Sequence, residues 1–288
     1  MTDVMTIEKN ALDERKTEER PVFSLFDRKV QVIVLNIDNQ KSNLSKPTYK
    51  VEILGKSISS WVVDAMQDYP VKTVNALIEN DVTSIISPYL EDSDYVVVLY
   101  CDTPLLTRET IDNALDYVCA KSMQVCKLDR GYIFSTPYIR TAEKIYSPKA
   151  YSFNPEDFFA VTNIAGLVKA TEILQQRIND FHIRRDVAIL QPASTAIAPS
   201  VRIGKGVVIM GNNTIMGDTI LSDNVIIKEG NMIRNAIISK GASVKASVIR
   251  DSIIMENAEI LPFCVIENNS IVKRGERVNS FTHFDKRK

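Results

Sequence analysis

Large aliphatic residues recur every six positions over the last third of the chain. The series runs at a strict spacing of six through Ile197, Ile203, Ile209, Ile215, Leu221, Ile227 and Ile233. Neither an α-helix, with about 3.6 residues per turn, nor a simple strand, with a period of about two, would place all of them on one face. In a hexapeptide repeat, six residues form one short strand and a turn, three strands close one triangular coil, and the aliphatic side chain points inward. The spacing therefore predicts a left-handed parallel β-helix over residues 190–279.

The repeat continues toward the end of the chain with a slightly shorter step. After Ile233 the spacing falls to five in places and then returns to six, through Ile238, Val244, Ile249, Ile254, Ile260, Ile266, Val272 and Val278. A tighter corner can absorb the missing residue without breaking the stack. Small and polar residues such as Gly204, Asn212 and Asp223 fill the expected corners, where a positive φ or a side-chain bond to the backbone is favoured. The alternative is a β-sandwich in which the spacing is coincidental.

Composition sets limits on the rest of the chain. With 288 residues, of which 45% are hydrophobic, the chain can bury a substantial core and is long enough for two domains. A formal net charge of −1 gives no basic footprint for nucleic acid or for an anionic membrane surface. Because no apolar run approaches the roughly 20 residues that span a bilayer, and the N-terminus is charged, we expect a cytoplasmic protein.

The cysteines lack the spacing of a metal or redox site, since no CxxC pair is present. They are Cys101, Cys119, Cys126 and Cys264. We interpret them as buried free thiols in a reducing compartment.

Before the repeat, apolar runs alternate with helix-compatible stretches. Residues 30–35 and 95–100 are nearly continuous apolar runs, which suit strands buried on both faces. The helix-compatible stretches are residues 59–68, 71–80 and 108–121. This alternation predicts a parallel sheet covered by helices on both sides. Ligands of such sheets bind beyond the carboxyl ends of the strands, here after Leu35 and Tyr100.

The segment after Tyr100 reads CDTPLLT and places Asp102 directly behind a buried strand. An aspartate at this position, with a tight proline-containing turn behind it, can hold a hard divalent cation and a nucleotide phosphate through oxygen ligands. The structural alternative is an aspartate that caps a helix or a turn.

Two segments resemble one family in particular. The stretch YVVVLYCDTPLLTRETI and the joining segment GLVKATEILQQRINDFHIRRDVAILQPAST, followed by the hexapeptide repeat, resemble bacterial N-acetylglucosamine-1-phosphate uridyltransferases, bifunctional enzymes that also carry a glucosamine-1-phosphate acetyltransferase. The resemblance extends from about Val30 to Phe284. It implies an α/β nucleotidyltransferase-like (Rossmann-like) domain followed by a left-handed parallel β-helix of hexapeptide repeats.

The resemblance also implies a division of the chain. Residues 1–27 would be a charged N-terminal arm, 28–163 a reduced nucleotidyltransferase-like domain, 164–189 a linker helix, 190–279 the left-handed β-helix, and 280–288 a charged tail. By analogy with the family, we expect a homo-oligomer, specifically a trimer, without nucleic-acid or membrane partners.

The metal site implied by the family is partly retained. Asp102 matches the aspartate that binds magnesium, while Cys101 replaces a glycine beside it. The second metal ligand of the family is an asparagine, and Thr162 stands at its position, with Asn163 next to it as a possible replacement. Mg²⁺ is therefore the expected cofactor if the protein is active.

The phosphate-binding loop of the family is not retained. In the family a loop with glycines and an arginine follows the first strand, because glycine lets the loop fold over a triphosphate and arginine offsets its charge. Here residues 36–46 contain neither, and Asp38 brings negative charge. Lys46 alone is a candidate phosphate contact, and its alternative is a solvated surface lysine. The base-reading motif is not recognisable, and much of the sugar-binding lobe is missing.

The acetyltransferase half is altered as well. Glu267 replaces an arginine that meets an anionic ligand in the family, and the family's catalytic histidine has no counterpart. His283 could act as a general base, but its surroundings indicate an ordinary surface residue. His182, at the end of the linker helix, is expected to cap or to pack.

Three hypotheses follow for the function. The first is a non-catalytic relative of the uridyltransferase, with a structural, regulatory or ligand-sensing role and a possible sugar nucleotide ligand. The second is an active metal-dependent sugar-1-phosphate nucleotidyltransferase of the UDP-N-acetylglucosamine pyrophosphorylase type, and the third, least favoured, is an acyltransferase. An active enzyme predicts an open cavity after Leu35, whereas a non-catalytic one predicts that Ile37 and Leu44 fill it.

Overall fold

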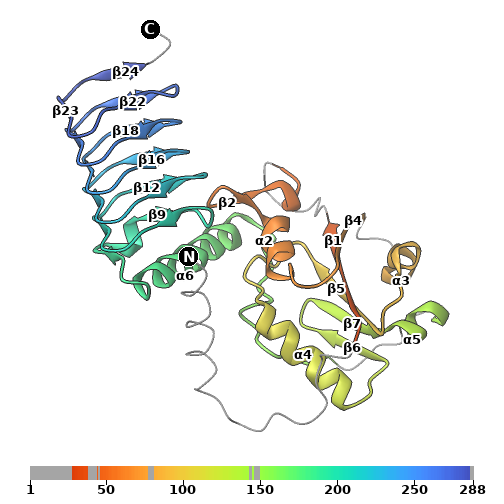
Figure 1. Cartoon of the computed structure of the whole chain (residues 1–288). Helices are drawn as coiled ribbons and strands as arrows, with labels where there is room; N and C mark the ends of the chain where they lie inside the picture. Colours follow the sequence, from red (N-terminus) through yellow and green to blue (C-terminus); the bar gives the residue numbers. More distant parts are fainter. Residues whose placement is uncertain are drawn as a thin grey trace.

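The chain folds into an α/β domain and a β-helix joined by one long helix (Figure 1). The structure is a computed structural model, which describes residues 28–37, 44, 46–76, 81–142, 145 and 150–285. The predicted fold class is confirmed. The proposed N-terminal arm at 1–27 lies outside the described residues.

A five-stranded sheet forms the centre of the α/β domain, in the order β4-β1-β5-β7-β6. Its strands are β1 (Val30–Ile37), β4 (Val71–Ala76), β5 (Tyr95–Tyr100), β6 (Val125–Leu128) and β7 (Gly131–Ser135). Strands β4, β1 and β5 are parallel, whereas β7 runs antiparallel to both β5 and β6. The sheet is therefore mixed, because the short β6–β7 hairpin replaces a helical crossover.

One sequence-based expectation for this domain is wrong. The stretch 71–80 is helix-compatible in sequence, but residues 71–76 form the edge strand β4, and residues 77–80 lie outside the described residues. Val74 alone is buried there, and Lys72, Thr73 and Asn75 are exposed. Backbone pairing with β1 outweighs the local spacing, as is usual for a strand with one open edge.

Helices and two small strands surround the sheet. They are β2 (Glu52–Ile53), β3 (Lys56–Ser57), α2 (Ile58–Ala65), α3 (Val82–Ile86), α4 (Arg108–Ala120), α5 (Thr136–Thr141) and the 3-10 turns at Thr48–Lys50 and Ser87–Tyr89. Helices α2 and α4 begin at Ser57 and Thr107, whose hydroxyls accept hydrogen bonds from the backbone N–H groups of Ser60 and Thr110. Both lie close to the predicted helical stretches 59–68 and 108–121.

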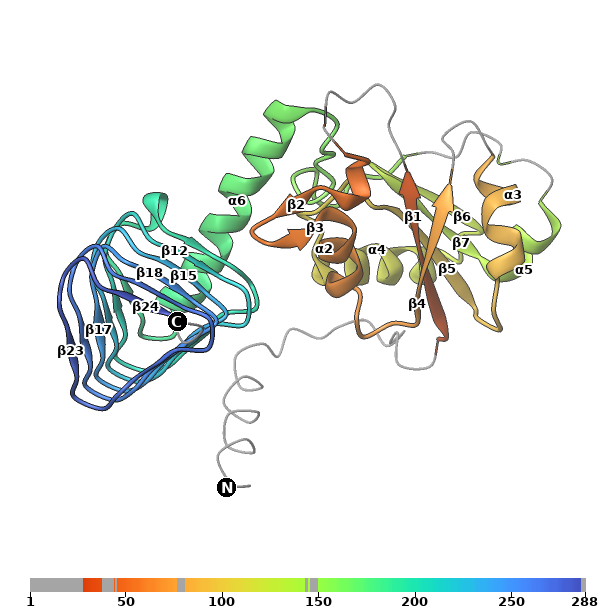
Figure 2. The ribbon, with the colours of Figure 1, turned by 90° about the horizontal axis from the view of Figure 1, so that it is seen from above.

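The C-terminal part is a stack of triangular coils made of three parallel sheets (Figure 2). The first sheet holds β8 (Ala188–Ile189), β11 (Val208–Ile209), β14 (Ile226–Ile227), β17 (Ser243–Val244), β20 (Glu259–Ile260) and β23 (Arg277–Val278). The second holds β9 (Ala196–Ile197), β12 (Thr214–Met216), β15 (Met232–Arg234), β18 (Val248–Arg250), β21 (Val265–Glu267) and β24 (His283–Asp285). The third holds β10 (Arg202–Ile203), β13 (Ile220–Leu221), β16 (Ile237–Ile238), β19 (Ile253–Ile254) and β22 (Ile271–Val272).

The hexad ladder forms the core of this β-helix. Its residues are buried, apart from the half-buried Ile203. Ile215 pairs with Ile233, 18 positions later, and Ile233 pairs with Ile249, 16 positions later, so the shorter steps in the sequence correspond to a shorter coil. Parallel pairing throughout the stack excludes the alternative of an antiparallel sandwich.

The stack extends beyond both predicted ends. It begins with β8 at Ala188, within the segment that we assigned to the linker, and it ends with β24 at Asp285, within the segment that we assigned to the charged tail. β24 belongs to the stack because Val265 and Ile266 of β21 pair with His283 and Phe284. The inward-facing Phe284 contacts the core, which a solvated tail would not do.

Helix α6 (Ile164–Ile183) lies between the two parts and contacts both (Figure 2). Ala170 and Leu174 are buried on its inner face against Ile53, Leu105 and Val161 of the α/β domain. A 3-10 turn at Pro192–Ser194 and strand β9 pack on the same helix from the side of the stack. No described helix is both long enough and apolar enough to cross a membrane.

Candidate functional site

Asp102 lies at the carboxyl end of β5, where the sequence placed it, and is buried. Its carboxylate is held by Arg130, whose Nε lies 3.1 Å from Oδ1 and whose Nη2 lies 2.5 Å from Oδ2. The guanidinium also lies over the ring of Tyr100, 4.6 Å from its centroid. Both carboxylate oxygens are thus engaged by one planar cation in a two-pronged pair.

The turn between β6 and β7 brings Arg130 to this place. Gly131 follows it with a φ of +139°, and a Cβ there would lie 2.4 Å from the carbonyl oxygen of Val98. Only glycine lets the hairpin approach β5 so closely. Burial alone would lower the pKa of Arg130, but the hydrogen bonds and charge of Asp102 outweigh burial and raise it. The guanidinium therefore remains charged.

Cys101, beside Asp102, offers no nucleophile. Burial raises the pKa of its thiol to about 12, and its Sγ lies 3.8 Å from the carbonyl oxygen of Ile37, to which it donates. A neutral thiol is a poor nucleophile and a poor metal ligand. All four cysteines are free, and Cys119 is partly exposed, unlike the other three.

Thr162 and Asn163 lie on the segment that leads into α6. This segment meets the strand end, because the backbone N–H of Val161 donates to the carbonyl oxygen of Asp102 at 2.7 Å. Asn163 caps α6, with its Oδ1 accepting from the N–H of Gly166 at 2.8 Å. Thr162 is exposed. Two of the three predicted metal ligands, Asp102 and Asn163, therefore already use oxygens in bonds within the protein.

Lys46 lies at a different place, beside the carboxyl ends of β1 and β4. It is exposed and borders an open hollow of about 720 Å³ whose lining also includes Asn36, Lys50, Ser59 and Thr73. Neither Asp102 nor Arg130 belongs to that lining. Among the described residues, Lys46, the predicted phosphate contact, and Asp102, the predicted metal ligand, therefore do not line the same cavity.

The loop that should distinguish the hypotheses is only partly described. Asp38 and the rest of residues 38–43 lie outside the described residues. Ile37 is buried in the core of the domain, and Leu44 is half-buried. Asn36 accepts a hydrogen bond from the hydroxyl of Ser59 at 2.6 Å and donates one to Asn75 Oδ1 at 3.3 Å. Ile37 thus belongs to the core of the domain, and neither Ile37 nor Leu44 lines the neighbouring hollow, which stays open.

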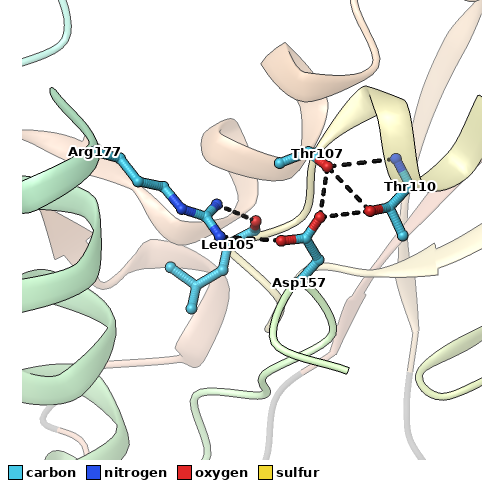
Figure 3. A network of polar contacts seen from close by, with 5 residues as sticks. All are labelled: Leu105, Thr107, Thr110, Asp157 and Arg177. Carbon is cyan, nitrogen blue, oxygen red and sulfur yellow. Dashed lines mark hydrogen bonds and ion pairs between the residues drawn. The ribbon is translucent and has the colours of Figure 1, made fainter. Parts of the chain in front are cut away.

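A second buried carboxylate joins α6 to the α/β domain (Figure 3). Asp157 is 1% exposed and accepts hydrogen bonds from the hydroxyls of Thr107 and Thr110. Arg177 of α6 lies 3.0 Å from Asp157 through Nη2, and its Nη1 donates to the carbonyl oxygen of Leu105 at 2.6 Å. The bonds that Asp157 and Arg177 make join segments far apart in the sequence, so we assign this network a structural role.

Sequence reasoning missed Arg130, Asp157 and Arg177. The DRG triplet at 129–131 between two short apolar runs is a turn signal, and it could have indicated a hairpin that returns an arginine to the sheet. Nothing in the sequence around Asp157 signals its burial.

Comparison with known proteins supports one relationship. No family model matches the chain. It is 33% identical over 141 residues to the "Bifunctional protein GlmU" of Lactobacillus delbrueckii subsp. bulgaricus, covering 48% of this chain and 31% of that protein. It is 28% identical over 137 residues to that of Clostridium novyi (48% and 30%) and 31% identical over 137 residues to that of Staphylococcus haemolyticus (46% and 30%).

The chain spans about a third of the length of these relatives. A solved structure, that of Rv0371c from Mycobacterium tuberculosis H37Rv, covers 50% of this chain and 98% of its own with 10% identity and a TM-score of 0.39, which is too low to support any argument. Several GlmU proteins match the chain at about 30% identity, and the observed fold is the one that the resemblance in sequence implied. Over about half of its length, the chain is thus similar in sequence to these bifunctional GlmU proteins.

Proposed function

We propose that this protein is a non-catalytic relative of the sugar-phosphate nucleotidyltransferases, with a structural, regulatory or ligand-sensing role. The observation that carries the proposal is the pairing of Asp102 with Arg130. A nucleotidyltransferase would use that carboxylate to hold a divalent cation on the nucleotide phosphates. Arg130 already neutralises its charge and donates hydrogen bonds to both of its oxygens, so a cation would have to displace a partly buried ion pair.

The surroundings support the same proposal. Residues 36–46 lack glycine and arginine, so the sequence offers little that could cradle a triphosphate. The amide oxygen of Asn163 already accepts a hydrogen bond from the N–H of Gly166 in the first turn of α6. A magnesium ion does not fit these residues as they are arranged, since the active alternative would require Arg130 to release Asp102 and Asn163 to release the N–H of Gly166.

The open hollow beside Lys46 is the observation that favours the active alternative. Two lysines, Lys46 and Lys50, border it together with the polar side chains of Asn36 and Ser59. Such a hollow could hold the phosphates of a sugar nucleotide, with or without chemistry. Under the non-catalytic proposal it is a place for ligand sensing, and a thermal-shift series with UTP and UDP-N-acetylglucosamine tests it.

The decisive experiment is an activity assay on the full chain. The protein is incubated with UTP, N-acetylglucosamine 1-phosphate and Mg²⁺, and pyrophosphate release is measured. We expect no release above a protein-free control. Release by the wild type that disappears in Asp102→Asn would overturn the proposal.

A binding experiment tests the reason for inactivity. In Arg130→Ala the carboxylate of Asp102 loses its cation, so this variant should gain a Mn²⁺ site that Mg²⁺ competes for. The double variant Arg130→Ala/Asp102→Asn should lack that site. Arg140→Ala is the matched control, because Arg140 is exposed and donates only to the carbonyl oxygen of Glu91 among its described hydrogen bonds. Equal Mn²⁺ binding by the wild type and Arg130→Ala would contradict this explanation.

We also propose self-association through the β-helix, as a trimer, in the cytoplasm. The stack exposes large apolar side chains, including Phe263 at 61% and Phe281 at 80%, whose rings stack with centroids 5.2 Å apart. Exposed apolar patches of this kind are typical of surfaces that a partner covers. Mass measurement in solution at micromolar concentration tests the trimer, and a monomer would contradict it.

A further inference from the structure

The last two strands of the second sheet place three metal-binding side chains on one outer face. In a strand, residues two positions apart point to the same side, so His283 and Asp285 of β24 share a side. Phe284 between them packs against the core, which puts both on the outside. Glu267 of β21 pairs with Asp285 in register, one coil below it. The topology thus brings one imidazole and two carboxylates together.

The distances within this cluster suit a single ion. His283 Nε2 lies 3.0 Å from Glu267 Oε1, and one ligand atom from each of the three residues lies within 4.8 Å of the others. Two ligands on one zinc ion, each about 2.1 Å from it, are about 3.0–3.5 Å apart. The first pair has this separation as a hydrogen-bonded pair, so an ion would take the place of the proton between Nε2 and Oε1, and rotation of the Asp285 carboxylate would bring the third ligand in.

The charges of the cluster favour a cation. Glu267 and Asp285 are register partners, and like charges directly opposite one another on neighbouring strands are destabilising. A divalent ion between the carboxylates would offset their repulsion.

From this geometry we infer that Glu267, His283 and Asp285 form a binding site for one divalent transition-metal ion of the zinc type. An imidazole with two carboxylates suits Zn²⁺ and Co²⁺, whereas Mg²⁺ prefers oxygen ligands alone. The side chain of Asn268 donates to Asp285 Oδ1 at 2.9 Å and so orients one ligand. The site is remote in sequence from Asp102, and it does not depend on whether the protein is catalytic.

The test is metal binding by the untagged full chain in a chelator-treated buffer. Isothermal titration with Zn²⁺ should give one site per chain, and Co²⁺ should give visible absorption bands of a low-symmetry site. Mg²⁺ should compete poorly. His283→Gln and Glu267→Gln each remove one ligand from an accessible face and should weaken Zn²⁺ binding at least about tenfold, as loss of even an outer partner does in known sites.

Glu259→Gln is the matched control. Glu259 is a carboxylate on a neighbouring face of the stack, paired with Arg277 at 3.4 Å, and its removal should leave Zn²⁺ binding unchanged. Circular dichroism establishes that each variant is folded. The inference is overturned if the folded wild type binds no Zn²⁺, or if binding is unchanged in both His283→Gln and Glu267→Gln.

Discussion

Among single side chains, His182 shows how burial sets the charge of a group. Its ring lies at the C-terminal end of α6, 7% exposed, with its edge toward Phe181 at a centroid distance of 5.2 Å. Burial, and then the positive charge of Arg185, lower its pKa below the usual 6.5. The sequence predicted that this histidine caps or packs, and its burial and its contact with Phe181 agree with packing.

The lowered pKa of His182 predicts a loss of stability in mild acid. As the pH falls, the unfolded chain takes up a proton on His182 near pH 6.5, while the folded chain does so only at a lower pH. The free energy of unfolding is therefore highest above about pH 7 and decreases toward about pH 5. His182→Gln should flatten this part of the profile, measured by urea unfolding at several pH values. The control, Arg184→Met, changes an exposed residue at the same end of α6 and should keep the slope of the wild type, whereas an equally steep profile in His182→Gln would refute the prediction.

The Asp102–Arg130 pair shows where prediction from the sequence stops. The position of Asp102 followed from the sequence, because an apolar strand and the CDTP turn are local signals. Its partner did not, because Arg130 is 28 positions away and reaches Asp102 only through the β6–β7 hairpin. From a single sequence, an aspartate that binds magnesium cannot be distinguished from one that pairs with an arginine.

Among the helices and strands, α6 is the element that joins the two parts of the protein. The predicted linker helix, 164–189, begins where α6 begins but runs six residues beyond Ile183, where α6 ends. The sequence did not predict β4, where an edge strand carries a helix-like spacing. The ion pair between Asp157 and Arg177, which anchors α6 to the α/β domain, could not be predicted either. The two residues come from separate segments that meet only in the folded chain.

Removal of the α6 anchor should weaken the joint. In Arg177→Met the aliphatic volume is kept, but Asp157 loses its cation while remaining buried. Because Arg177 is 38% exposed, we expect a moderate loss, about 1–3 kcal/mol in the free energy of unfolding. Trp61, the single tryptophan, packs in the same interface and reports it by fluorescence during urea unfolding.

Two comparisons establish the cause of that loss. Arg184→Met removes an exposed arginine from the end of the same helix and should change stability little. In a double-mutant cycle, Arg177→Met should cost less in the background of Asp157→Asn, because no buried charge is then left alone. Additive effects of the two substitutions would show that the pair does not stabilise the joint.

For the molecule as a unit, a buried polar ladder accompanies the aliphatic core of the stack. Asn213 Oδ1 accepts from the backbone N–H of Asn231 at 2.9 Å, Asn231 Oδ1 accepts from that of Ser247 at 3.0 Å, and Ser247 Oγ accepts from that of Cys264 at 3.1 Å. Each side chain thus satisfies a backbone group one coil further along. The hexads predicted the apolar core, but they could not predict this ladder, because its rungs are 16 to 18 positions apart and differ in residue type.

The ladder makes one asparagine important for the whole stack. Asn231 also donates through Nδ2 to Asn213 Oδ1 at 2.9 Å and to the carbonyl oxygen of Lys228 at 2.7 Å. Through Asn213 on one side and Ser247 on the other, it links its coil to both neighbouring coils. Asn231→Ala would leave the buried N–H of Ser247 without its acceptor, and we expect a loss of about 2–4 kcal/mol in the free energy of unfolding. Because each coil of a solenoid contacts only its neighbours, a fault in the middle weakens the stack on both sides. Urea unfolding by far-ultraviolet circular dichroism measures the loss, and Trp61 fluorescence monitors the interface between the α/β domain and α6.

Lys245→Ala is the control for this prediction, since Lys245 is exposed on the adjacent coil and should change stability by less than about 0.5 kcal/mol. Asn231→Asp gives a sharper comparison. It keeps an oxygen acceptor for Ser247, but it replaces the amide donor with an oxygen that faces the carbonyl of Lys228 and Oδ1 of Asn213. Repulsion between these acceptors should make Asn231→Asp at least as destabilising as Asn231→Ala at neutral pH. If Asn231→Asp were as stable as the wild type, the donor half of the ladder would contribute nothing, and backbone pairing together with packing of the hexads would hold the coils in register.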